Sequence, residues 1–176
     1  MRLHLKDICS FLKTRQLDAA SLQELRVAGG DVPLLPSSKD YNWFTTREAA
    51  EPFIAYGPVI TMGKARYANI KYCEVEFVSS NNMLIQSKNP NQLYLRYLYY
   101  YLRRHSSKVY VMGTTYPKFD LDRFNALSIP LPSLPEQKQI AALFDDLHAQ
   151  MDSCRYAISL LDEQVKSLFN ERWATA

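Results

Sequence analysis

Residues 128–147 read SIPLPSLPEQKQIAALFDDL. Pro130, Pro132 and Pro135 fall within the first eight of these residues, and no proline or glycine follows from Glu136 through Ala176. Proline interrupts a helix that would continue backwards through it, and it biases the preceding residue toward extended geometry. The stretch therefore predicts a stiff, extended approach that leads into a long helix.

The start of that helix is predicted by Ser133 and Glu136, which have the spacing of a capping box. In a capping box the serine hydroxyl accepts the backbone N–H of the glutamate, and the glutamate carboxylate accepts the backbone N–H of the serine. Pro135 falls in the first turn, where its missing N–H costs little. We therefore expect the helix to begin at Ser133.

Apolar residues recur along the helix at alternating steps of four and three. This seam consists of Ile140, Phe144, Leu147, Met151, Cys154, Ile158, Leu161, Val165 and Leu168. Such a narrow heptad pattern is typical of a coiled coil, and a helix from residue 133 to 170 would be about 55 Å long. A helix lying across its own domain is the alternative, although that arrangement usually shows a wider apolar stripe. No other segment predicts a helix of matching length, so we expect the partner helix to come from another chain or from a region outside this sequence.

The preceding residues predict a separate globular domain. Residues 28–40 are rich in turn-forming residues and predict a loop, whereas residues 53–86 are rich in Val, Ile, Tyr and Phe and predict strands joined by tight turns. Asn89 and Pro90 predict the start of a helix that buries Leu93, Tyr97 and Leu98 and exposes Tyr100. The fold class is therefore α+β: residues 1–132 form a domain with a twisted, largely antiparallel sheet or partly open barrel, and residues 133–176 form the coiled-coil helix.

The charge is unevenly distributed. Residues 1–130 carry 17 Lys and Arg against 11 Asp and Glu, whereas residues 131–176 carry 4 against 7. Residues 64–118 alone carry nine basic and two acidic residues, interleaved with tyrosines. Basic side chains contact phosphates, and amide and hydroxyl side chains read base edges, so this segment predicts a double-stranded DNA surface. The candidate DNA-binding residues are Lys64, Arg66, Lys71, Asn81, Asn82, Arg103, Arg104, Lys108, Thr114, Thr115, Tyr116 and Lys118. Each of them taken alone is also compatible with an ordinary solvated surface residue, and residues 113–118 with a structural turn.

Catalytic patterns are absent from the sequence. It has no glycine-rich cofactor turn, and Asn-Pro-Asn-Gln at 89–92 lacks the second proline and the aromatic residue of an adenine methyltransferase motif. Glu74 and Glu76 are expected to lie on the same face of a strand. A nuclease site would need a further acidic residue and a lysine beside them, and the sequence has neither at a suitable spacing. The three cysteines and three histidines are scattered, so no metal site is predicted. The lack of these catalytic patterns predicts a protein that is not an enzyme and holds no cofactor. The sequence has neither a signal peptide nor a membrane-spanning run, so we expect it to be cytoplasmic.

Several segments resemble the specificity subunits of type I restriction-modification systems. These segments are LHLKDICSFL (3–12), LYLRYLYYYLRR (93–104), GTTYPKFDLDRFNALSIPLP (113–132), LSIPLPSLPEQKQIAALF (127–144) and SLFNERW (167–173). The resemblance implies a target recognition domain followed by a spacer helix. It also implies two such units in the full subunit, held apart by antiparallel helices. The implied partners are double-stranded DNA, a methyltransferase subunit, a restriction subunit, and a second specificity half or a second copy of this chain. S-adenosylmethionine and ATP would belong to the partner subunits.

Two alternatives remain open at this point. One is a coiled-coil dimeric interaction protein that binds DNA without sequence preference. The other is the recognition domain of a single-chain restriction-methylation enzyme, of which this sequence would be a part. The DNA target itself does not follow from one sequence.

Overall fold

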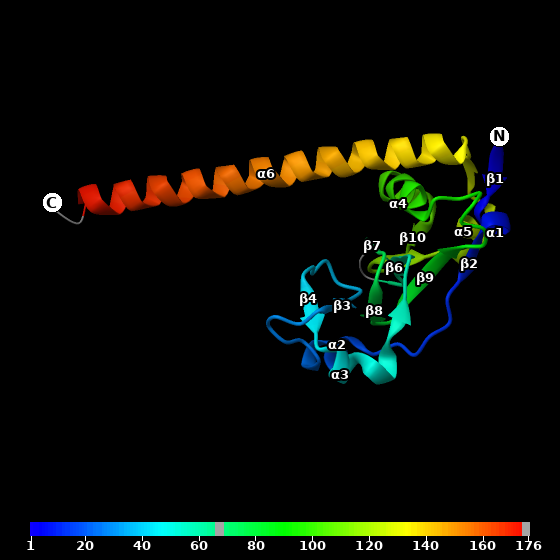
Figure 1. Ribbon diagram of the computed structural model, residues 1–176, viewed down its shortest axis with the longest axis horizontal. Coiled ribbons are helices and arrows are strands. Elements are labelled where there is room, and N and C mark those ends of the chain that lie inside the picture. Colours follow the sequence, from blue (N-terminus) through cyan, green and yellow to red (C-terminus); the bar gives the residue numbers. More distant parts are fainter. Residues whose placement is uncertain (66–68, 174–176) are drawn as a thin grey trace. The chain divides into compact units, whose positions relative to one another are not determined.

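The computed structural model describes residues 1–65 and 69–173, so Arg66 lies outside the described residues. The α+β prediction is confirmed (Figure 1). The helices are α1 (Leu5–Ile8), α2 (Ala19–Glu24), α3 (Arg47–Ala50), α4 (Leu95–Arg104), α5 (Leu121–Ala126) and α6 (Leu134–Trp173). The strands are β1 (Arg2–His4), β2 (Cys9–Phe11), β3 (Val32–Leu35), β4 (Trp43–Thr45), β5 (Ala55–Tyr56), β6 (Val59–Gly63), β7 (Ile70–Cys73), β8 (Glu76–Ser79), β9 (Asn82–Ser87), β10 (Tyr110–Met112), β11 (Pro117–Phe119) and β12 (Ser128–Pro130).

Two four-stranded sheets form the centre of the domain. The first has the order β2-β9-β6-β7 and is antiparallel throughout. The second has the order β4-β3-β8-β5, in which β3 and β8 are parallel and the other pairs antiparallel. Two further antiparallel pairs, β1-β12 and β10-β11, complete the described strands. The predicted antiparallel character is therefore confirmed, except at the β3-β8 pair.

The apolar core lies between the two sheets. Leu35, Ala55 and Phe77 of the second sheet pack with Val59, Cys73 and Leu84 of the first. A second cluster fills the other face of the second sheet, where Leu22 of α2 and Ala50 of α3 pack against β3 and β8. Helix α4 contacts β6 and β7, and Figure 1 shows it on the far side of the sheets from α2 and α3. Both sheets are thus covered on their outer faces, which explains why β6 is buried along its whole length.

Three local predictions for the segment 28–40 and for helix α4 are wrong. The segment 28–40 contains strand β3, because Leu34 and Leu35 are buried against β8. Asn89 caps a turn, accepting a hydrogen bond from the Asn91 N–H at 3.0 Å, and α4 begins only at Leu95. Tyr100 is buried, since tertiary packing covers a face of α4 wider than the predicted stripe.

The predicted long helix is confirmed as α6, which is 40 residues long. The Glu136 carboxylate accepts the Ser133 N–H at 2.8 Å, as a capping box requires. The second half of the predicted box is wrong: the Ser133 hydroxyl donates to the same carboxylate at 2.5 Å instead of accepting the Glu136 N–H. These two hydrogen bonds lower the pKa of Glu136.

The chain divides into two compact units, Met1–Lys138 and Gln139–Ala176. The first turn of α6 thus belongs to the first unit. The reason is Gln137, which is completely buried and is hydrogen-bonded to Gln92, Tyr94 and Pro132. Within residues 1–65 and 69–173, no helix is long and apolar enough to cross a membrane.

Candidate nucleic-acid interface

Several connecting segments meet at one end of the first sheet. Gly63, at the end of β6, pairs with Asn82 at the start of β9, and its N–H donates to the Asn69 carbonyl at 3.0 Å. The turn before β9 reaches the second sheet, because the Ser80 N–H donates to the Leu35 carbonyl at 3.2 Å. Leu17 forms a bridge with Ser80, which places the N-terminal segment at the same end. Segments far apart in the sequence therefore form one continuous edge.

The β10-β11 hairpin joins this edge through its root. The Phe119 N–H donates to the Lys64 carbonyl at 2.9 Å, and the Tyr110 hydroxyl donates to the Gly63 carbonyl at 2.8 Å. The Tyr110 ring lies edge-on to Phe119, with ring centroids 5.9 Å apart. Burial of the Tyr110 hydroxyl raises its pKa, so this group remains a neutral hydrogen-bond donor. The root of the hairpin is therefore rigidly attached to β6.

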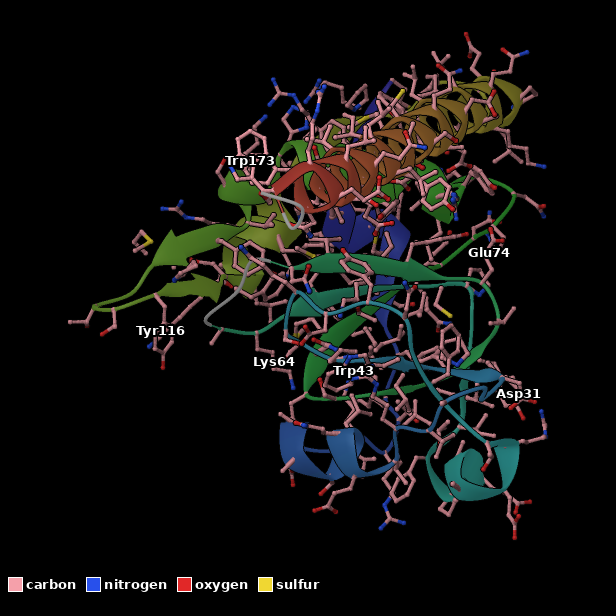
Figure 2. All side chains as sticks on the ribbon, turned by 90° about the vertical axis from the view of Figure 1, so that its left-hand side faces the viewer. Asp31, Trp43, Lys64, Glu74, Tyr116 and Trp173 are labelled. Carbon is pink, nitrogen blue, oxygen red and sulfur yellow. The ribbon has the colours of Figure 1, made fainter. Side chains whose placement is uncertain are left out.

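The tip of the hairpin is exposed, in contrast to its root. It turns through Thr114 and Thr115, closed by a 3.0 Å hydrogen bond from the Gly113 N–H to the Tyr116 carbonyl. Met112 is 76% exposed and Tyr116 40% exposed. Figure 2 shows Tyr116 on a hairpin that projects from the body of the domain, on the same side as Lys64. A projecting two-stranded ribbon with hydroxyl side chains at its tip has the dimensions to enter a DNA groove.

Beside the hairpin lies a depression of about 260 Å³, lined by polar and basic residues together with Phe11, Leu12, Met83 and Leu84. Lys13, Thr14 and Gln16 line one side of it, and Lys64 and Asn82 the other. The Gln16 amide donates to the Asn82 carbonyl at 2.9 Å and joins the two sides. Lys13 and Gln16 were not among the predicted residues, because they precede the strongly basic segment. The only sequence signal was a polar run, Lys-Thr-Arg-Gln at 13–16, which begins two positions after the last residue of β2.

Two predicted DNA-binding residues lie inside the domain. Lys71 is 4% exposed, and its ammonium donates to the Pro36 carbonyl at 2.6 Å. Asn82 is 3% exposed, and its amide donates to the Leu35 carbonyl at 2.9 Å and to the Ser79 hydroxyl at 3.0 Å. Both side chains are therefore buried, unlike ordinary surface residues, although Asn82 also lines the depression of about 260 Å³. Both side chains instead hold the connecting segments to the sheets.

The other described candidates lie on the surface. Arg104, Lys108, Lys118 and Asn81 are exposed, as are Lys64, Thr114, Thr115 and Tyr116. Exposed Arg103 donates to the Tyr99 hydroxyl at 3.2 Å, with its guanidinium 5.5 Å from the centre of that ring. A depression of about 150 Å³ separates Arg103 and Ser106 from Tyr41 and Asn69. Since Asn69 is bonded to Gly63, this basic end of α4 lies near the same edge. DNA contact by these residues stays a prediction.

The acidic pair considered for nuclease chemistry is not on one strand face. Glu74 lies in the turn between β7 and β8, and it accepts a 2.7 Å hydrogen bond from the Tyr72 hydroxyl. Glu76 begins β8 and forms an ion pair with Arg47. The expectation that both point to one face is therefore wrong, because a turn intervenes. Among the residues that the structure describes, no group of three His, Cys, Asp or Glu is placed to hold a metal ion.

The apolar seam of α6 is largely solvent-exposed in this single chain. The exposed fraction rises from 40% at Phe144 to 59% at Ile158 and 65% at Leu168. Ile140 is half-buried, and the remaining seam residues Leu147, Met151, Cys154, Leu161 and Val165 are exposed. Phe169 and Trp173 stack in parallel beyond the seam, with ring centroids 4.5 Å apart. Contiguous exposed apolar surface of this kind marks an interaction site.

Comparison with solved structures identifies similar folds. The type I restriction-modification S subunit from M. genitalium is similar with a TM-score of 0.64 and 16% identity, over 87% of this chain and 40% of that one. A chain from a study of complex assembly and conformational transition in the type I R-M system is similar with a TM-score of 0.62 and 16% identity. That match covers 96% of this chain and 43% of that one. The chain thus spans less than half the length of either protein. No curated protein sequence is significantly similar to it.

The family is identified by a sequence match that covers most of the chain. Residues 2–158 match the type I restriction modification DNA specificity domain. The match includes the two sheets, the β10-β11 hairpin and the first part of α6. The suspected relationship is therefore confirmed, and the chain belongs to the family of type I restriction-modification DNA specificity domains.

Proposed function

We propose that this chain is the recognition unit of a type I specificity subunit and reads the sequence of double-stranded DNA. The observation that carries the proposal is the single polar edge to which residues 13–16, Lys64 and the β10-β11 hairpin contribute. Lys64, Lys118 and the basic end of α4 supply phosphate contacts that position the domain, while amide and hydroxyl groups reach base edges. Like other members of the family, the chain would itself be non-catalytic.

The chemistry would reside in partner subunits. A methyltransferase subunit would carry S-adenosylmethionine, and a restriction subunit would carry ATP. The recognition unit would direct both to the DNA in the cytoplasm. The chain spans about 40% of the M. genitalium subunit, and a subunit of that length would have room for a second recognition unit. The exposed seam of α6 would bind the second unit's helix in an antiparallel coiled coil, and the second unit would be another specificity half or a second copy of this chain.

Enrichment from a randomised pool of DNA duplexes tests the recognition function. The 176-residue chain would be incubated with the pool at increasing salt, and the bound duplexes sequenced. We expect one motif to be enriched and to stay enriched as salt rises, since base-edge contacts depend less on salt than phosphate contacts. Binding without an enriched motif would overturn sequence recognition and favour a dimeric protein with non-specific DNA affinity.

A further inference from the structure

The loop of residues 36–42, which joins β3 to β4, is held in place by several specific contacts. Lys71 donates to the Pro36 carbonyl at 2.6 Å, and the Ser37 N–H donates to the Ser80 hydroxyl at 2.8 Å. The Asn69 amide donates to the Ser38 carbonyl. The loop is thus attached to β7 and to the turn before β9, although its sequence, PSSKDYN, has no apolar residue other than Pro36 and Tyr41 to anchor it.

The loop also has an ordered internal conformation. The Ser38 hydroxyl donates to the Asp40 carboxylate at 2.5 Å, and the Lys71 ammonium lies 5.0 Å from the centre of the Tyr41 ring. Asn42 adopts a left-handed backbone conformation with φ 60°. Asparagine tolerates this conformation better than most residues other than glycine. The result is a fixed loop in a place where a polar surface loop would ordinarily be mobile.

Burying the Lys71 ammonium to hold this loop costs folding free energy. Side chains alternate along β7, and Tyr72 packs on Tyr99 of α4 with ring centroids 5.6 Å apart, so Lys71 extends from the opposite face. Cys73, on the same face as Lys71, belongs to the apolar core between the sheets. Burial lowers the pKa of Lys71 to about 8, since an ammonium loses its hydration there. Packing alone would favour an apolar residue at this position, and features that cost stability concentrate at functional sites.

The anchored loop presents side chains suited to reading base edges. Lys39, Asp40, Tyr41 and Asn42 are all exposed. An aspartate accepts from the cytosine amino group, and an asparagine pairs with two groups of adenine. The loop also lies at the candidate interface, because Asn69, which holds Ser38, is bonded through its own carbonyl to Gly63 beside Lys64. These side chains therefore continue the polar edge already described.

We propose that residues 36–42 form a specificity-determining loop and that Lys71 is the positioning residue that holds it in its DNA-reading conformation. The proposal rests on the proposed function, because it assigns base reading to one part of the same interface. Lys71 acts through the loop and does not touch DNA.

The first test requires no DNA. Lys71→Met removes the ammonium and keeps most of the side-chain volume. Lys88→Met is the matched control: Lys88 also donates to a backbone carbonyl, that of Lys6 at 2.6 Å, but it is exposed and follows the opposite end of β9. We expect trypsin to cleave the native Lys71→Met chain after Lys39 faster than wild type by on the order of tenfold. Equal cleavage rates in all three proteins would overturn the anchoring role.

The second test measures specificity with the randomised duplex pool. Asp40→Ala and Asn42→Gly alter the loop directly, and glycine keeps the left-handed backbone at residue 42 available. We expect Lys71→Met and both loop variants to lose discrimination at one or more positions of the enriched motif. Affinity for the unselected pool should stay within about threefold, since phosphate contacts persist. If Lys71→Met melts below the assay temperature, the two loop variants decide the question.

The outcomes separate this inference from the proposed function. If wild type enriches no motif, recognition itself fails and the loop proposal fails with it. If wild type enriches a motif and the loop variants enrich the same motif with equal discrimination, the loop proposal is overturned while the proposed function stands.

Discussion

The side-chain carbonyl oxygen of Gln137 accepts a hydrogen bond from the Tyr94 N–H at 2.9 Å. The Gln137 amide nitrogen donates to the Gln92 carbonyl at 2.9 Å and to the Pro132 carbonyl at 3.0 Å. One completely buried side chain thus joins the residues before α4, the proline-rich approach and the first turn of α6. Gln137, in the Pro-Glu-Gln sequence, therefore couples the start of α4 to the start of α6.

Gln137→Leu should lower the free energy of unfolding by about 2–4 kcal/mol. Leucine fills the space but removes three hydrogen bonds, those to the Tyr94 N–H and to the Gln92 and Pro132 carbonyls. A typical hydrogen bond contributes about 0.5–1.5 kcal/mol to stability. Urea denaturation would measure the loss. Gln139→Leu, at an exposed position two residues later, should change stability by no more than about 0.5 kcal/mol. Equal effects of the two changes would show that Gln137 does not join these elements.

Ser133→Ala should move the pKa of Glu136 back toward its ordinary value. The hydrogen bonds from the Ser133 hydroxyl and N–H favour the ionised carboxylate and lower this pKa. Stabilisation from the ionised form is present above the ordinary pKa and is lost as pH falls through the lowered one. A titration of the Glu136 side chain by NMR would measure both proteins. An unchanged pKa in the variant would mean that the backbone N–H alone lowers it.

Replacing Arg103 and Arg104 by alanine should weaken DNA binding. Each arginine that meets a phosphate contributes about one unit to the slope of log affinity against log salt, so the slope should flatten by about one to two. Binding isotherms on one duplex at several salt concentrations would give this slope. Lys88→Ala removes an exposed basic residue beyond the opposite end of β9 and should leave the slope unchanged. If the arginine variant also keeps the wild-type slope and affinity, the end of α4 is outside the interface.

Ile158→Lys should dissociate a homodimer formed through α6 and leave the first unit folded. Cys154 is the midpoint of the seam from Ile140 to Leu168, so antiparallel pairing centres on it. Sedimentation at micromolar concentration would compare this variant with wild type and with Ser159→Lys, an exposed change beside the seam. A wild-type chain that remains monomeric would contradict pairing with a second copy.

The direction of pairing needs its own measurement. Ile140→Cys and Leu168→Cys would be placed in separate Cys154→Ser chains, which are then mixed and oxidised. Antiparallel helices bring the two positions together across the dimer, whereas parallel helices place them about 40 Å apart. We expect a disulfide-linked mixed dimer. Cross-linking only between identical chains would indicate parallel helices.

Lys71 should make the stability of the domain depend on pH in the alkaline range. Its folded pKa of about 8 lies below the ordinary 10.5, so the unfolded chain binds the extra proton between these values. The wild-type free energy of unfolding minus that of Lys71→Met should therefore rise from pH 8 to 10.5, by at most about 1.4 kcal/mol per unit. Taking the difference cancels the opposite contribution of Cys9, whose thiol pKa is raised to about 12 by burial. A difference that stays constant through this range would mean that Lys71 is hydrated.

Elements with local signals could be predicted from the amino-acid sequence. The prolines before Glu136 and the regular seam predicted α6, and its observed first residue, Leu134, follows the predicted start by one position. The alternation of strand-forming residues and turns between residues 53 and 86 predicted β5 to β9, five of the eight strands of the central sheets, but not β2, β3 or β4. The basic segment and the turn at the hairpin tip could also be predicted from the sequence, because exposed charges and turn residues depend little on distant parts of the chain.

Which polar side chains face solvent depends on contacts between distant parts of the chain. Lys71 and Asn82 stand in the basic segment like any surface residues, but each is buried against a carbonyl that lies far away in the sequence, Pro36 and Leu35 respectively. The polar edge likewise depends on strand pairing that brings Gln16 to Asn82 and Lys64 to Phe119. The local sequence shows which chemical groups are available for such a site, but not which groups they contact. Their partners are set by long-range backbone pairing, which is specified by the packing of the whole core.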